Sequence, residues 1–288
     1  MVDLHLLHPP LRMLDRDHPL THVFSKLRSL EVQSEPVVSL SSDARYLAAA
    51  RSIAARDRRG VCLRLGIEQA AGQSLQGRVD SVLADVGVAP AACDLVLDLG
   101  APSFDPLEDF ADLVCTLVSE LPHLRRWRSF ALLGTSFPPT LAGLPVGLTL
   151  LPRQEWRLYR RLLSLPSLRK ARVPDFGDYG INHPAVLKED MRILKPSAAI
   201  RYTVDDGWLI ARGTNLRVAG AFRQFYRLSA DIVGSRHYCG PDYSVGDQRI
   251  KQCASGKGGP GSLTTWRFIG TNHHLEKVAR DLATQLGP

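Results

Sequence analysis

The segment Trp266-Arg267-Phe268-Ile269-Gly270-Thr271-Asn272-His273-His274 ends in an amide and two imidazoles. Imidazoles transfer protons near neutral pH and bind metal ions. We predict an apolar strand over residues 265–270 and a helix over 275–286, so these groups would follow a strand and precede a helix. Turns of that kind carry the binding and catalytic groups of parallel sheets and barrels.

Three aspartates are also expected at strand ends. Asp98 follows an apolar run, and Asp175 and Asp178 stand three residues apart in a stretch with two glycines. Paired carboxylates can bind a divalent cation or carry out acid and base steps. Together with His273 and His274 they are the candidate catalytic residues. The structural alternative is that the aspartates form turns or helix caps, while one histidine caps the final helix and the other satisfies a buried polar network.

Carboxylates with two imidazoles are the ligand set of barrel metallohydrolases, in which a bound ion acidifies water. Such barrels usually present a His-x-His pair at the first strand, whereas here His5 and His8 are three residues apart and cannot share one face of a strand. We therefore assign no metal ligand and predict no cofactor. The alternative is a metal-assisted hydrolase that uses a divalent metal on a phosphate-bearing or nucleotide substrate. Whether the chain is an enzyme is left open.

Arginine dominates the basic residues, and the net charge of the chain is +7. This balance favours acidic partners such as nucleic acid or an acidic protein. On a helix predicted over residues 153–163, four arginines share one face and are candidates for contacts with phosphates: Arg153, Arg157, Arg160 and Arg161. The alternative is that this face is simply solvated.

Short apolar runs alternate with amphipathic segments along the chain. We predict strands over residues 3–7, 36–40, 61–65, 95–99, 130–134, 172–176, 200–204 and 265–270. We predict helices over residues 20–30, 44–56, 75–86, 107–121, 153–163, 222–233, 247–254 and 275–286. Several of these strands are apolar on both faces, which is typical of parallel strands covered by helices.

Eight strands alternating with helices favour an α/β fold, a (β/α)8 TIM-like barrel that spans residues 1–288 as one domain. Residues 1–35 fit the pattern least well, so we expect an irregular first strand. Residues 200–213 contain two apolar runs around Asp205-Asp206-Gly207, which predicts a β-hairpin inserted at the rim. Because all strand ends of a barrel meet at one mouth, the candidate residues would lie together there.

Five cysteines are scattered without CxxC spacing, which argues against a disulfide framework and against a structural zinc site. No apolar run approaches the roughly 20 residues that cross a bilayer. The N-terminus lacks the features of a secretory signal, so we expect a cytoplasmic protein without membrane contact. The oligomeric state is left open.

Several motifs occur in order in the C-terminal half: FGDY from Phe176, IRYT from Ile200, GDQRI from Gly246 and WRFIGTNHH from Trp266. Over roughly residues 95–280 the chain resembles the phage "beta protein" family. The resemblance implies a protein of prophage and mobile-element cassettes linked to anti-phage defence, often encoded beside a toxic or nuclease-like partner. It implies no defined reaction.

The resemblance and the expected rim together indicate the binding residues. The ligand-binding set is Tyr179, Arg201, Tyr202, Asn272 and His274, with Asp178 and His273 beside it. We therefore expect a non-catalytic or weakly catalytic component of a phage-defence or toxin-control cassette. It would bind a partner protein or a phage-derived ligand at the polar rim. Nucleic-acid binding through the arginine face is a third hypothesis.

Overall fold

The computed structural model describes residues 1–7, 11–13, 17–185 and 196–286. By their contacts these residues form two compact units. Unit 1 comprises Met1–Gly134 and Leu158–Gly177, and unit 2 comprises Thr135–Arg157 and Asp178–Pro288. The expectation of one domain over residues 1–288 stays a prediction, because a unit defined by contacts need not fold independently.

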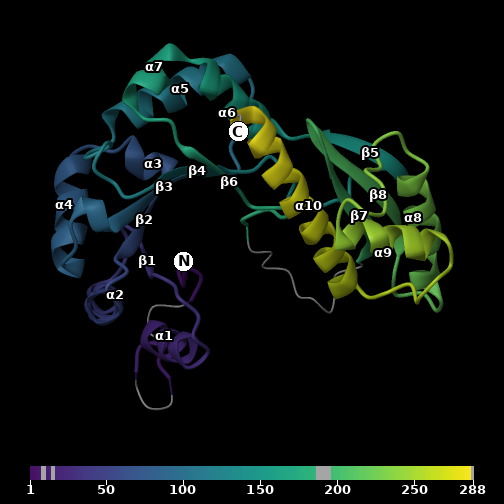
Figure 1. The fold of residues 1–288 in the computed structure, drawn as a ribbon, viewed down its shortest axis with the longest axis horizontal. Helices are drawn as coiled ribbons and strands as arrows, with labels where there is room; N and C mark the ends of the chain where they lie inside the picture. The colour runs from purple at the N-terminus through teal and green to yellow at the C-terminus, as the bar shows by residue number, and fades with distance from the viewer. Residues whose placement is uncertain (8–10, 14–16, 186–195, 287–288) are drawn as a thin grey trace. The chain divides into compact units, whose positions relative to one another are not determined.

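Unit 1 contains a five-stranded sheet with the order β1-β2-β3-β4-β6 (Figure 1). Its strands are β1 (Val37–Val38), β2 (Val61–Gly66), β3 (Cys93–Gly100), β4 (Phe130–Gly134) and β6 (Asp175–Asp178), the last residue of which counts with unit 2. The pairs β1–β2, β2–β3 and β3–β4 are parallel. At the middle of this sheet Leu63, Leu65, Leu95 and Leu97 are fully buried.

Helices alternate with these strands. They are α1 (Pro19–Ser29), α2 (Ala44–Asp57), α3 (Ile67–Ala70), α4 (Leu75–Val86), α5 (Leu107–Glu120) and α7 (Pro166–Ala171), with a 3-10 turn η1 (Pro90–Ala92). A further helix, α6 (Gln154–Ser164), contributes residues to both units. The start of α2 is set by Asp43, whose carboxylate accepts hydrogen bonds from the backbone N–H groups of Arg45 and Tyr46.

Unit 2 contains a three-stranded antiparallel sheet with the order β5-β8-β7. Its strands are β5 (Gly147–Pro152), β7 (Ser197–Val204) and β8 (Gly207–Asn215), and its helices are α8 (Gln224–Val233), α9 (Val245–Ala254) and α10 (Leu263–Leu286), with a 3-10 turn η2 (Ala221–Arg223). Helices α8 and α10 pack on β7, and α9 packs on both helices (Figure 1). The predicted hairpin is confirmed, because β7 and β8 pair with Val204 opposite Gly207.

The α/β class is confirmed, but the (β/α)8 TIM-like barrel is wrong. The described strands form two separate sheets, and neither closes on itself. The largest error concerns residues 265–270, which belong to α10 and not to a strand. Trp266, Ile269, His273 and Lys277 are buried at helical spacing along α10. Because a short apolar run is compatible with either element, its pattern alone did not decide between them.

Three other regions differ from expectation. Residues 3–7 form no strand, although an isolated bridge joins Val2 to Pro36, and His8 lies outside the described residues. The strand predicted over residues 172–176 is displaced to β6. The edge strand β5 was not predicted. Its residues alternate between half-buried and exposed positions, and its exposed side includes Leu148 and Leu150, so it lacks the clear polar face expected of such a strand.

Candidate functional site

Helix α10 approaches its neighbours closely because two contact positions are glycines. A Cβ atom at Gly270 would lie 2.8 Å from the backbone oxygen of Arg201 in β7. One at Gly246 in α9 would lie 2.5 Å from a backbone oxygen of α10. Side chains on this side of α10 are thereby held against both elements. The adjacent His273 and His274 are buried here, with exposed fractions of 0% and 1%.

His273 joins α10 to α9 and to β7. Its Nδ1 lies 2.8 Å from an Asp247 carboxylate oxygen, and its Nε2 lies 2.8 Å from the carbonyl oxygen of Thr203. Both ring nitrogens therefore face oxygen atoms of neighbouring elements. The same carboxylate accepts hydroxyl hydrogen bonds from Tyr202 and Ser244 at 2.7 and 2.6 Å. Burial acts to raise the pKa of Asp247, but these hydrogen bonds and the charge of His273 hold it below its ordinary value.

His274 connects α10 to β6 and β7. Its Nε2 lies 2.9 Å from an Asp178 carboxylate oxygen, and its Nδ1 lies 2.9 Å from the hydroxyl of Thr203. Burial acts to raise the pKa of Asp178, but the hydrogen bond and charge of His274 hold it below its ordinary value. A hydroxyl, an imidazole and a carboxylate in this order could act as nucleophile, base and orienting group. Thr203 is 0% exposed, so the hydroxyl offers no surface to a substrate.

Arg153 places a fully buried guanidinium among three carboxylates. Its nitrogens lie 3.6 Å from oxygens of Glu155, Asp178 and Asp281. These distances are those of ion pairs, and among the described residues the guanidinium nitrogens have no hydrogen-bond partner. Burial raises the pKa of Glu155, whose Oε2 accepts a hydrogen bond of 2.8 Å from the hydroxyl of Ser136. The cation therefore balances carboxylates that solvent cannot screen.

We call these residues the unit 2 network. It brings together several of the predicted candidates and residues that sequence reasoning did not select. Its members are Arg153, Glu155, Asp178, Tyr202, Thr203, Asp247, His273, His274 and Asp281. Each of the two histidines satisfies buried polar groups of neighbouring elements, but neither caps the final helix, because both lie inside α10.

The other predicted ligand-binding residues lie in the same unit. Asn272 accepts a hydrogen bond of 2.7 Å from the backbone N–H of Gly246, which ties α10 to the start of α9. Arg201 donates to the carbonyl oxygen of Ile181 at 2.9 Å, and burial lowers its pKa to about 10. Tyr179 is half-buried. A ligand-binding role for these residues stays a prediction.

The four candidate arginines do not share one environment. Arg153 has no exposed surface, whereas Arg157, Arg160 and Arg161 are half-buried. Arg157 lines a hollow of about 400 Å³ in unit 2. In unit 1, Arg161 donates to Glu108 at 2.6 Å. A nucleic-acid role for the arginines stays a prediction, and Arg153 could take part only if the fold opened.

The remaining candidate carboxylates belong to unit 1. Asp175 is exposed at the start of β6. Asp98, near the end of β3, lines a pocket of about 520 Å³, which we call the unit 1 pocket. Lining residues follow or end β1, β2 and β3, so the pocket lies at the carboxyl edge of these parallel strands. Open α/β sheets bind their ligands at this edge.

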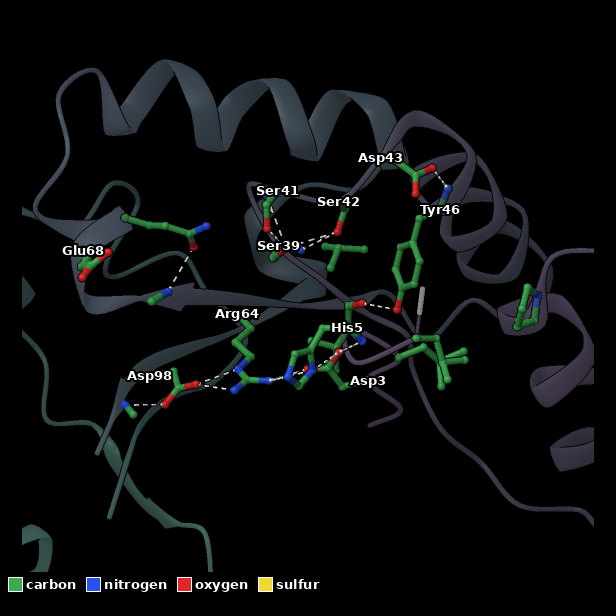
Figure 2. Close-up of a pocket in the computed structure, with 18 of the residues that line it drawn as sticks. Asp3, His5, Ser39, Ser41, Ser42, Asp43, Tyr46, Arg64, Glu68 and Asp98 are labelled. Atoms are coloured by element: carbon green, nitrogen blue, oxygen red, sulfur yellow. Dashed lines mark hydrogen bonds and ion pairs between the residues drawn. The ribbon is translucent and has the colours of Figure 1, made fainter. Parts of the chain in front are cut away.

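The polar wall of the unit 1 pocket centres on Arg64 of β2. Figure 2 shows its guanidinium between Asp98 on one side and Asp3 with His5 on the other. Two of its nitrogens donate to Asp98 at 2.8 and 2.5 Å, and the third donates to Asp3 at 2.7 Å. Burial acts to raise the pKa of Asp3, but hydrogen bonds from the His5 backbone and from Arg64 hold it below its ordinary value.

The rest of the lining combines hydroxyl groups, aromatic rings and apolar side chains. The Tyr46 hydroxyl donates to the carbonyl oxygen of Val37 at 2.9 Å, and burial raises the pKa of Tyr46 to about 12. His18 caps α1, and burial together with nearby Arg12 lowers its pKa. Other lining side chains include Ser39, Ser41, Ser42, Leu4, Leu7, Leu11, Ile67 and Leu99.

In this pocket sequence reasoning selected Asp98 as a catalytic candidate, and a further signal was present. Ser41, Ser42 and Asp43 stand between a predicted strand and a predicted helix, which is the position that singled out Asp98. In unit 2 the missed partner was Asp247, which follows Ser244 at the spacing of a capped helix start.

The described residues also bear on two other features, a metal centre and a membrane-spanning helix. Within them, no group of three or more His, Cys, Asp or Glu side chains is arranged to hold a metal ion. No helix in this part of the chain has both the length and the apolar composition to cross a bilayer.

A protein-family model described as "Beta protein" matches residues 1–280 of the chain. The match therefore includes the N-terminal third, which contains most of the unit 1 pocket, as well as the motifs of the C-terminal half. No curated protein and no solved structure gives a significant match.

Proposed function

This chain belongs to the Beta protein family, and from that premise we propose that it is a ligand-binding component of a phage-defence or toxin-control cassette. Its ligand is a small molecule that enters the unit 1 pocket. The resemblance to phage proteins supports the cassette, and the geometry of unit 1 supports the binding of a ligand.

The position and size of the unit 1 pocket carry the binding half of this proposal. Its volume of about 520 Å³ falls within the range of about 300–1,000 Å³ that small-molecule sites occupy. The ion pairs of Arg64 with Asp3 and Asp98 hold the polar wall in place, so little ordering is needed when a ligand enters. The candidates His273 and His274, in contrast, are buried.

Filling the pocket tests this half directly. Ser41 is exposed and lines the pocket, so the indole of Ser41→Trp would occupy space that the ligand needs. Small molecules released on denaturing the purified protein are measured by mass spectrometry. We expect the wild type to release a compound that Ser41→Trp does not retain.

The matched control is Ser81→Trp, at an exposed position of α4 that is not among the pocket residues. It should retain the compound as the wild type does. Equal amounts of the compound from Ser41→Trp and the wild type would contradict the proposal, and so would the absence of any released compound from all three proteins.

The partner half of the proposal rests on the resemblance. The partner is a toxin-like or nuclease-like protein encoded beside this chain. Co-expression of the two proteins should restore growth that the neighbour alone inhibits, and the purified pair should elute together in size-exclusion chromatography. Unchanged growth inhibition, together with separate elution at micromolar concentrations, would contradict it.

A metal-assisted hydrolase acting on a phosphate-bearing or nucleotide substrate stays the alternative prediction. It requires a divalent ion that co-purifies with the chain at about one equivalent, which elemental analysis measures. It also requires turnover of a phosphate ester that Asp175→Asn abolishes. Ligand release without turnover would favour the binding protein.

A further inference from the structure

The lining of the unit 1 pocket carries information about the charge of its ligand. Among the described lining residues, four are carboxylates and one is a guanidinium: Asp3, Asp43, Glu68, Asp98 and Arg64. A pocket for phosphate or carboxylate ligands needs a cation or backbone N–H groups that are available to the anion. The lining features that could supply such donors include Arg64, the imidazoles of His5 and His18, and the starts of α1 and α2.

Arg64, His5 and the start of α2 are already engaged by carboxylates, and at the start of α1 the backbone N–H of Leu20 donates to His18 Nδ1. All three guanidinium nitrogens of Arg64 donate to Asp98 or Asp3. At the start of α2, the Asp43 carboxylate accepts from the backbone N–H groups of Arg45 and Tyr46. An anion entering the pocket would have to displace a carboxylate from these donors, which costs the hydrogen bonds of that carboxylate and adds like-charge repulsion.

The remaining polar groups suit a ligand that donates hydrogen bonds. The Glu68 carboxylate is exposed at the pocket, and Figure 2 shows it apart from the ion pairs of Arg64. After β1, the Ser39 hydroxyl lies 3.0 Å from that of Ser41 and 3.3 Å from that of Ser42. Hydroxyl oxygens and carboxylates both accept from an ammonium group. Apolar side chains, among them Leu4, line the same cavity and suit an apolar body.

We propose that the unit 1 pocket binds a cationic amine carried on an apolar body and rejects phosphate and carboxylate ligands of the same size. The inference rests on the proposed function, because it names the ligand class of that site. It assigns recognition of the ammonium group to Glu68 and the serine hydroxyls, and accommodation of the body to the apolar wall.

Two probes that share an indole ring and differ in charge test this assignment. Tryptamine carries an ammonium group and indole-3-acetate carries a carboxylate. Saturation-transfer NMR and calorimetry with the full chain should show tryptamine binding at least about tenfold more tightly than indole-3-acetate. Ser41→Trp should abolish the binding of tryptamine. Glu68→Gln, at an exposed position where folding is not at risk, should weaken it several-fold.

The outcomes separate the ligand class from the site. If indole-3-acetate binds as tightly as tryptamine and Ser41→Trp abolishes its binding, the pocket is a ligand site, but the proposal that its ligand is a cationic amine is overturned. If tryptamine binds equally to the wild type, Ser41→Trp and Glu68→Gln, its binding lies elsewhere and the assignment is overturned. If neither probe binds, the class is overturned, and the released-compound experiment decides independently whether the pocket is a ligand site.

Discussion

In unit 1, Arg64 pairs with Asp3 and Asp98 on the wall of a pocket of about 520 Å³, whereas in unit 2 Arg153 pairs with carboxylates and has no exposed surface. Both regions use arginine, aspartate and histidine. In unit 1 the ion pairs line a volume that a ligand can enter, whereas in unit 2 the basic partners Arg153, His273 and His274 are buried. Side-chain types therefore indicate which reactions are possible, while solvent access decides whether those side chains can contact a substrate.

Removal of the buried Arg153 guanidinium should destabilise unit 2 more than any other change considered. Arg153→Met leaves Glu155, Asp178 and Asp281 without their shared counter-charge, so we expect the free energy of unfolding to fall by about 3–5 kcal/mol. Urea unfolding followed by circular dichroism measures the change. The control Arg227→Met, at an exposed position of α8, should stay within about 0.5 kcal/mol of the wild type. A loss as small as that of the control would mean that Arg153 is solvated.

Asp247→Asn should lower the free energy of unfolding by about 2–3 kcal/mol at neutral pH. It removes the charge of the carboxylate that is hydrogen-bonded to His273 and to the hydroxyls of Tyr202 and Ser244. The folded pKa of Asp247 is depressed. Its stabilisation is therefore complete above the unfolded pKa of about 3.9 and is lost as pH falls through the lower folded pKa.

Urea unfolding from pH 7 down to pH 2.5 measures this dependence. The difference in unfolding free energy between the wild type and Asp247→Asn should shrink as the solution becomes acidic. Asp242→Asn, at an exposed position of the same unit, should show a much smaller difference at each pH. A difference for Asp247→Asn that is constant from pH 7 to pH 2.5 would exclude an ionised Asp247 as the source.

Gly246→Ala tests how closely α9 and α10 approach each other. The added Cβ would lie 2.5 Å from the backbone oxygen of Ile269, so the helices must separate, at a cost of about 1–3 kcal/mol. Thermal unfolding measures the loss. An unchanged melting temperature would show that the two helices are not in direct contact.

The smallest expected effect is a gain in stability from a substitution in unit 1. A Cβ atom at Gly77, in α4, would meet no other heavy atom within 4 Å. Gly77→Ala should therefore stabilise the chain by about 0.5–1 kcal/mol, since alanine loses less backbone entropy in a helix. Equal losses for Gly77→Ala and Gly246→Ala would mean that helix propensity, and not contact between helices, governs both positions.

Local elements of this fold were predictable where the spacing of apolar residues agreed with the residues that mark the end of a helix or a turn. The helix predicted over residues 75–86 matches α4, and the hairpin over 200–213 follows from two apolar runs around a turn. The run at Trp266 had no such second signal, and the strands wrongly predicted there and over residues 3–7 completed the count of eight that suggested a barrel. Closure of a sheet depends on pairings between distant strands, which a single sequence does not display.

The candidate site was predictable in part for the same reason. Asp178, His273 and His274 do lie together, but through helix spacing and not through a barrel mouth. Burial of a polar side chain depends on what packs over it, so the sequence could not distinguish the enclosed His274 from a catalytic one. The pocket depended on the turn after β1, which stands between a predicted strand and a predicted helix but was not selected.

Chemical labelling of carboxylates tests most directly whether unit 1 is open and the unit 2 network is closed. Asp3 and Asp247 form a matched pair, because each binds a cation and each has a depressed pKa, while only Asp3 lines a cavity. The native chain is treated with a water-soluble carbodiimide and an amine, and each site is quantified by mass spectrometry. We predict modification of Asp3 in the native state and of Asp247 only after unfolding. Modification of native Asp247 as fast as Asp3 would contradict the account.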